Sequence, residues 1–393
     1  MFGVFGFVWI AACSAVIRPL PSKGGPAWVE LKTAHFTMWT DAPAERGRRL
    51  VREMERRRQV IMTAMNHAPS TSTAFVIALD SKREVDAYLP AEFAASAWPP
   101  DPPIYQPGIL LAATGEDSNH AVSHELAHVI SFAVIRNQPA WFAEGLATYF
   151  EMVDLDHGES SVQIGIPRDD RSTELRRSRP LPVATLFACT EPRCEDGRFY
   201  ATSWLVFSYL LNEHFDQFSR YLQYLNEHPH GKPDEAWRAV FPALTPSELD
   251  ATLLTWIRSG AVRLPHIEVT TQDFPSTERS LGDADVLAAR SLLALGFKND
   301  AAAVRTLSEA ALALDRTHLL ARLVNIAVTQ NIAPDDARAT AAAHPDDWRA
   351  WRLVAFALSN TPEGAVAYER MCTLSGNAAA GCAQRSVSDK SSR

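Results

Sequence analysis

The sequence predicts an α+β domain followed by a smaller all-α domain. Strand-like runs alternate with helical patterns before residue 118, and helical periodicity dominates after it. Beyond residue 281, short Ala- and Leu-rich helices are separated by polar turns. The chain has 393 residues, of which 47% are hydrophobic, so it can bury two or three domain-sized cores. We expect a folded domain over 28–263, a linker over 264–281, a helical domain over 282–373 and a flexible tail over 374–393.

The charge balance argues against one class of function. The chain has 38 Lys and Arg residues against 46 Asp and Glu residues, which gives a formal net charge of −8 at pH 7. Nucleic-acid binding draws much of its affinity from cations that neutralise phosphates. We therefore expect no nucleic-acid partner.

The N-terminal segment is apolar. Residues 1–12 carry no charge and match the core of an export signal, but they are shorter than the ~18–20 residues of a membrane span. The sequence Ile-Ala-Ala-Cys, which ends at Cys13, resembles a bacterial lipobox, in which the cysteine is lipidated. No Lys or Arg precedes Arg18, so a start assigned too late or a weak signal also fits. We expect a signal or lipoprotein-like segment over 1–22 and a place in the bacterial cell envelope, periplasmic or lipid-anchored through Cys13.

The first elements of the folded domain follow from periodicity and turn residues. Asp41 and Pro43 are favoured at helix starts, and apolar residues at helical spacing follow them as far as Met65. On this helix, three consecutive arginines at 56–58 are interpreted as part of the solvated face, although contact with anionic lipid is an alternative. The other predicted elements are a strand in 28–40, a strand at 73–79, a helix at 81–88, a Pro-rich loop at 98–103, a strand at 108–113 and a polar, Arg-rich loop at 154–179.

One motif carries chemistry. His124, Glu125 and His128 form an HExxH sequence inside a clear helical pattern. Residues four apart project from one face of a helix, so both imidazoles can reach a single Zn²⁺ while Glu125 reaches a water beside it. The motif alone is only moderately specific, and a catalytic zinc site requires a third protein ligand.

Glu144 is the candidate for that third ligand. It lies on a second predicted helix at 139–152, which follows the first after a short turn that ends in Pro139. Two helices joined by so short a turn pack as neighbours. We therefore expect Glu144, 16 residues after His128, to lie over the two histidines.

These two segments together resemble a gluzincin metallopeptidase, in particular the bacterial peptidase MA-like families. The second segment, Pro-Ala-Trp-Phe-Ala-Glu-Gly-Leu-Ala-Thr-Tyr-Phe-Glu at 139–151, is also similar to a helix of the M1 aminopeptidases. The Gly-x-Met-Glu-Asn motif of those aminopeptidases is absent, which argues against their specificity. The resemblance extends over 28–263 and is sharpest over 123–151.

The resemblance implies a zincin-like fold and a role for each residue. His124, His128 and Glu144 would bind Zn²⁺, and Glu125 would act as the general base. Tyr200 resembles the downstream tyrosine that donates to the oxyanion, although packing at the start of an apolar helix explains it equally simply.

Other polar residues near the motif have weaker assignments. His120 can touch substrate or lie on the surface, and Thr148 can orient an imidazole. His214 and Glu151 have no role that the sequence reveals. The strand at 108–113 is the expected edge to which a peptide substrate would add.

The C-terminal helices resemble a degenerate tetratricopeptide array. The sequence Ala-Arg-Leu-Val at 321–324 returns as Trp-Arg-Leu-Val at 351–354. Helices are predicted at 284–297, 301–314, 318–329 and 346–358. They would bind a partner protein or serve as a plain helical cap.

The cysteines fit an oxidising compartment. Apart from Cys13 they form two local pairs, Cys189 with Cys194 and Cys372 with Cys382. Both pairs can form disulfides in a periplasm, although buried or free thiols fit the same positions.

Two function classes remain. The first is an exported zinc peptidase, and the second is an inactive peptidase-like envelope scaffold that binds a partner protein through its C-terminal helices. The intact set of two histidines and two carboxylates favours the peptidase. A chance HExxH in a helical core would bury charged groups without partners, which is costly.

Overall fold

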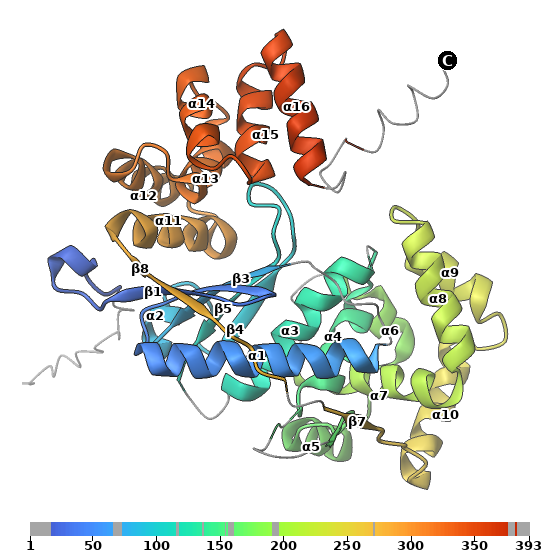
Figure 1. The fold of residues 1–393 in the computed structure, drawn as a ribbon. Coiled ribbons are helices and arrows are strands. Elements are labelled where there is room, and N and C mark those ends of the chain that lie inside the picture. The colour runs from blue at the N-terminus through green and yellow to red at the C-terminus, as the bar shows by residue number, and fades with distance from the viewer. Residues whose placement is uncertain are drawn as a thin grey trace, which may run out of the picture.

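The protein is built on one mixed sheet with helices on both faces (Figure 1), which confirms the α+β class. The computed structural model describes residues 17–65, 73–114, 118–135, 137–153, 155, 161–190, 196–269, 272–375 and 382. Cys13 and nearly all of the export segment, Cys194, and most of the predicted tail lie outside these residues. Among the described helices, none is long and apolar enough to cross a bilayer.

Six strands form the central sheet, in the order β4-β5-β3-β2-β1-β8. β2, β3 and β5 are parallel, whereas β1, β4 and β8 are antiparallel to their neighbours. β3 and β5 are buried along their whole length, which explains their continuous apolar sequences. The strands are β1 (Trp28–Lys32), β2 (Phe36–Thr40), β3 (Ala74–Leu79), β4 (Ala95–Trp98), β5 (Gly108–Ala112) and β8 (Thr277–Leu281).

Two details of the sheet differ from the prediction. The stretch 28–40 is a hairpin of β1 and β2. β5 is not the edge strand, because it lies between β3 and β4, and β4 forms the edge. β4 has only four residues, too few to show a period of two in the sequence.

Successive side chains along each strand point to opposite faces of the sheet and contribute to two hydrophobic cores. Met38, Val76 and Ile109 face the helices that carry the HExxH motif, whereas Trp39, Ile77 and Leu110 face the C-terminal helices. In Figure 1, α1 crosses one side of the sheet and α11 lies on the other. The helices of the first side include α1 (Ala44–Ala64), α3 (Ser118–Val134), α4 (Ala140–Phe150), α6 (Val183–Ala188), α7 (Gly197–Glu213), α8 (Phe215–Glu227), α9 (Pro233–Val240) and α10 (Pro246–Ser259), and the short α2 (Lys82–Val85) belongs to the second.

The range 264–281 is not a linker. β8 pairs with β1 along five residues, and Arg279 on β8 forms an ion pair with Glu30 on β1, with a distance of 3.2 Å. The short β7 (His266–Glu268) pairs with β6 (Ser161–Gln163). Four of the five β8 residues are exposed, so its polar sequence resembles a loop even though it is an edge strand.

The range 154–179 also contains regular structure. It holds β6 and the helix α5 (Asp169–Arg177). α5 exposes or half-buries all of its residues, so it lacks the apolar periodicity by which a helix is found in a sequence.

Six α-helices follow β8 in the described part of the chain, and most of them pack against the next one. The predicted helix at 301–314 is confirmed, and those at 284–297, 318–329 and 346–358 agree with the structure to within a few residues. α14 and α16 were not predicted, because each buries mainly small residues. The helices are α11 (Asp283–Leu293), α12 (Ala301–Leu314), α13 (Leu319–Thr329), α14 (Pro334–Ala343), α15 (Trp348–Ala357) and α16 (Pro362–Leu374).

The cysteine prediction is confirmed for one pair. Cys372 and Cys382 form a disulfide. Cys189 is disulfide-bonded as well, and Cys194, its predicted partner, lies outside the described residues.

A chain that ends at Arg263 is expected to be insoluble or to melt without cooperativity. It would lose β8, which covers the edge of β1, and the helices that bury Trp28 and Trp39. Soluble yield and a thermal melt followed by circular dichroism would test this expectation. A chain that ends after Cys382 is the control, since it retains every described residue. A cooperative melt of the 1–263 fragment would restore the interpretation as two independent domains.

Candidate metal centre

Helix α3 supports the two histidines. Its apolar residues Val122, Leu126 and Ala127 are buried against the sheet and α1. His124 and His128, one turn apart, project from the opposite face and remain 9% and 8% exposed. Both rings are therefore nearly buried, and α3 fixes their positions.

Helix α4 places Glu144 opposite these rings. Pro139 precedes its first turn, and Phe142 and Leu146 bury its other face. Gly145 allows close packing on α7, because a Cβ atom there would lie 2.6 Å from the backbone oxygen of Ser203. The glycine next to the carboxylate thus fixes the position of the helix that carries it.

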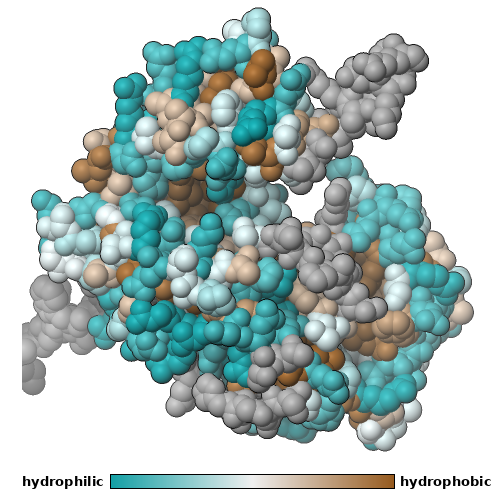
Figure 2. All heavy atoms as spheres, in the orientation of Figure 1, coloured by the Kyte–Doolittle hydropathy of each residue, from teal (hydrophilic) through white to brown (hydrophobic). Residues whose placement is uncertain are grey.

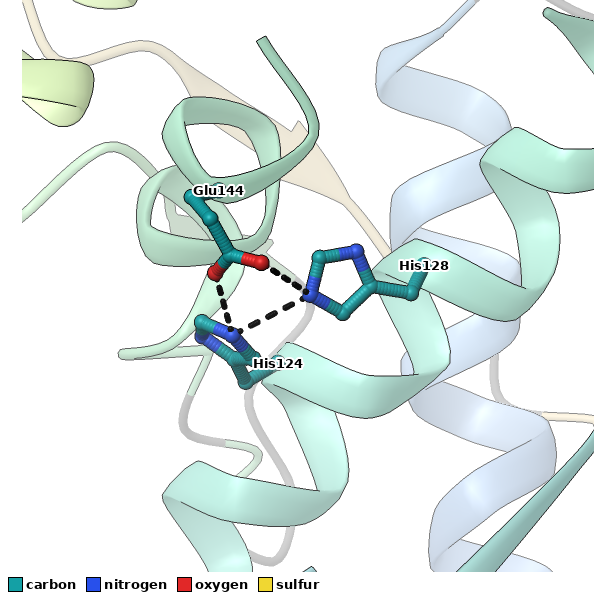
Figure 3. Close-up of side chains that lie close together, drawn as sticks. All are labelled: His124, His128 and Glu144. Atoms are coloured by element: carbon teal, nitrogen blue, oxygen red, sulfur yellow. Dashed lines mark hydrogen bonds and ion pairs between the residues drawn. The ribbon is translucent and has the colours of Figure 1, made fainter. Parts of the chain in front are cut away.

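Three donor atoms converge between α3 and α4 (Figure 3). Glu144 Oε2 lies 3.1 Å from His124 Nε2, and Glu144 Oε1 lies 3.4 Å from His128 Nε2. The two Nε2 atoms are 3.2 Å apart. All three residues offer a ligand atom within 4.8 Å of one another, so this group could hold a metal ion.

The electrostatics of the group favour a cation. Burial alone would raise the pKa of Glu144, but His128 and His124 outweigh this effect and hold the pKa well below its usual value. The carboxylate is therefore ionised. A divalent cation at this point would bind both imidazole nitrogens and the carboxylate at once. Two nitrogens and one oxygen are a donor set that zinc accepts in catalytic sites.

Glu125 is held beside the cluster by the edge strand. Its Oε2 accepts a hydrogen bond of 2.6 Å from the backbone N–H of Ala97 on β4. Glu125 follows His124 directly on α3, and this hydrogen bond ties its carboxylate to the edge strand β4. A carboxylate next to a candidate ligand histidine is a candidate general base.

Tyr200 contacts the ring of His124. The two rings are 6.0 Å apart between centroids and meet edge to face. Asp196 caps the start of α7 by accepting a hydrogen bond from Phe199 N, which fixes the first turn of the helix where Tyr200 lies. The structure therefore brings together all five predicted site residues.

A group of buried charges lies next to Tyr200. Glu151 is 3% exposed, and its Oε1 lies 3.2 Å from Arg168 and 3.7 Å from Arg171. The guanidinium of Arg171 in turn stacks 4.6 Å from the centre of the Tyr200 ring. Glu151 follows Glu144 by seven residues, or two helical turns, which places the two carboxylates on the same side of the chain.

Arg57 connects the two ligand-bearing helices. It lies in the arginine run that was predicted to be solvated, but it is 3% exposed. Its Nη1 donates to Ser123 Oγ on α3 at 2.6 Å and to the backbone oxygen of Val153, just after α4, at 2.5 Å. The prediction for this residue was wrong, because its partners lie 66 and 96 residues away in the sequence.

The weaker candidates are not part of the cluster. His120 is half-buried, and its Nδ1 lies 3.4 Å from the backbone oxygen of Glu151. Thr148 is fully buried, and within the described structure its hydroxyl has no hydrogen-bond partner, so it does not orient an imidazole. His214 bonds Tyr209 and Gln217 at the junction of α7 and α8.

The comparison with known proteins leaves the function open. Residues 118–230 match the sequence profile of a family described as proteins of unknown function, DUF1570. The matched stretch begins with α3 and includes all five predicted site residues. No curated protein matches the chain.

Proposed function

We propose that this protein is an exported, zinc-dependent peptidase of the gluzincin type, with a zincin-like catalytic fold. The observation that carries the proposal is the convergence of His124, His128 and Glu144 beside Glu125. A catalytic zinc site needs three protein ligands and an open position, and these side chains could supply the three ligands. Zinc, when bound, would lower the pKa of a water to about 7 and polarise a carbonyl.

The protein's own residues perform the proton transfers. Glu125 accepts a proton from the attacking water on its carboxylate and later donates it to the leaving amine. The hydrogen bond from Ala97 N–H fixes the orientation of this carboxylate. Tyr200 packs against the ring of His124, and its hydroxyl would donate a hydrogen bond to the oxyanion of the tetrahedral intermediate.

The edge strand suggests how a peptide substrate binds. Among the described strands, β4 has a neighbour on one side only, and its Ala97 is the residue that contacts Glu125. An extended peptide that adds to this edge would place its backbone beside the general base. The sequence predicted that the peptide would add to the strand at 108–113, and we now propose β4 for this role.

The zinc content of the full chain is the first test. The protein is purified without chelators or a metal-binding tag and analysed for metals, with an expected content near one zinc per chain. Hydrolysis of a peptide library should disappear after chelation and return with added zinc. A chain that takes up no zinc even after addition would contradict the proposal.

Tyr200→Phe is expected to lower kcat by about 10²-fold and to leave the zinc content unchanged. The substitution removes one oxyanion donor and retains the ring that packs on His124 and Arg171. Steady-state kinetics on a peptide cleaved by the wild type would measure the effect, and Tyr224→Phe on α8 is the matched control. An unchanged kcat would restrict Tyr200 to packing.

A further inference from the structure

A cavity lies on the side of helix α4 that faces away from Glu144. Its volume is about 710 Å³, within the range of small-molecule sites. Phe142, Leu146 and Tyr149 line it from α4 and recur at helical spacing. Glu144 is two residues from Phe142, or about 200° around the helix, so it faces the opposite way. The cavity is therefore distinct from the metal centre.

The interior of this cavity is apolar. Besides the α4 residues, Phe207 and Leu211 of α7 and Phe218 of α8 line it. Phe142, Leu146, Phe207 and Phe218 are each at most 4% exposed. In Figure 2, apolar surface lies in the hollow between the body of the molecule and the helices on its right. Such a lining fits a hydrocarbon chain and penalises a peptide, whose backbone groups would lose their hydrogen bonds to water.

Tyr149 contributes a polar group to the cavity wall. The residue is 4% exposed and lies on the cavity side of α4. Burial raises its pKa to about 12, so the hydroxyl is protonated and can donate or accept a hydrogen bond.

The rim of the cavity is polar and carries a cation. Ser219 and Gln223 of α8 are exposed, and Arg263 reaches the opening from the segment after α10. Arg263 Nη2 donates to the backbone oxygen of Asn212 at 2.6 Å, which fixes the guanidinium there. The same nitrogen forms an ion pair with Glu213 Oε1 at 3.8 Å. The remaining nitrogens of Arg263 have no hydrogen bond within the described residues, so they can receive an anion.

We propose that this cavity binds a single-chain amphiphile, with its aliphatic chain among the aromatic residues and its anionic headgroup at Arg263. The apolar interior and the cation at the mouth match the two ends of such a molecule. The Tyr149 hydroxyl then meets the oxygen of a polar substituent on the chain or a water carried in with it.

Equilibrium dialysis of radiolabelled dodecanoate, below its micellar concentration, tests the proposal on the full chain. We expect saturable binding of one equivalent. Leu211→Trp fills the cavity and should weaken binding at least tenfold, whereas Leu314→Trp, on the exposed surface of α12, should not. A thermal melt of each variant shows whether it is folded.

If Leu211→Trp does not fold, a substitution at the rim of the cavity tests the proposal instead. Arg263→Gln should weaken dodecanoate binding by about tenfold, the usual value of a charge-assisted hydrogen bond, and leave dodecanol binding unchanged. Absence of saturable uptake by the wild type would overturn the proposal. Equal affinity in the wild type and in folded Leu211→Trp would overturn it as well, and equal loss of both ligands in Arg263→Gln would overturn the role of the headgroup.

Discussion

Glu125→Gln is expected to retain one zinc per chain and to lower peptide hydrolysis by about 10²–10⁴-fold, the usual contribution of a general base. Glutamine is nearly isosteric with glutamate, and its side-chain oxygen can still accept the hydrogen bond from Ala97 N–H. The amide cannot take a proton from water at neutral pH. Zinc binding survives because the three proposed ligands are untouched.

The measurement compares kcat/KM and metal content on the same preparation. Glu309→Gln is the matched control, since Glu309 is exposed on α12 in the helical half of the chain. Full hydrolysis by Glu125→Gln would remove this residue from the mechanism. A wild type that binds zinc but cleaves nothing in a broad peptide library would instead favour the scaffold, whose partner would then be sought on the C-terminal helices.

The part of the site that lies on one helix was predictable from the sequence. His124, Glu125 and His128 are placed by helical periodicity alone, because their mutual geometry depends only on local backbone structure. Glu144 required one further step, the packing of two helices joined by a short turn. Its 3.1 Å contact with His124 agrees with that expectation.

The supporting charges were not predictable in the same way. The sequence places Arg57 in a run of arginines and Glu151 at the end of an apolar helix, and neither context indicates burial. Their partners come from segments brought together only by the fold, such as Ser123 for Arg57 and Arg171 for Glu151. Buried charges are stable only when paired, so their location depends on tertiary structure.

The predicted linker at 264–281 was wrong for a related reason. β8 pairs with β1 across about 250 residues of sequence, and no local pattern encodes such a partner. Its four consecutive exposed polar residues, with Leu281 alone buried, are those of an exposed edge. The C-terminal helices therefore share a core with the sheet, through Trp39 and Ile77, instead of forming a separate domain.

His128→Ala is expected to abolish zinc binding and, with it, the stabilisation that zinc provides. The substitution removes one of three ligands and leaves His124 and Glu144 as a pair. A metal that binds only the folded state stabilises it by about 2.7 kcal/mol at a concentration 100 times Kd. The wild type should therefore melt at a higher temperature in zinc than in chelator, and the two melting curves of His128→Ala should coincide.

The comparison of zinc with chelator separates loss of the metal from loss of packing. His128 is only 8% exposed, so alanine at this position also loses packing and lowers the melting temperature in both solutions. Only the difference between the two melting temperatures reports on zinc. His230→Ala, at an exposed position beyond α8, is the control and should keep the full difference. A zinc-dependent shift that persists in His128→Ala would mean that the ion binds elsewhere, and the ligand set of His124, His128 and Glu144 would have to be abandoned.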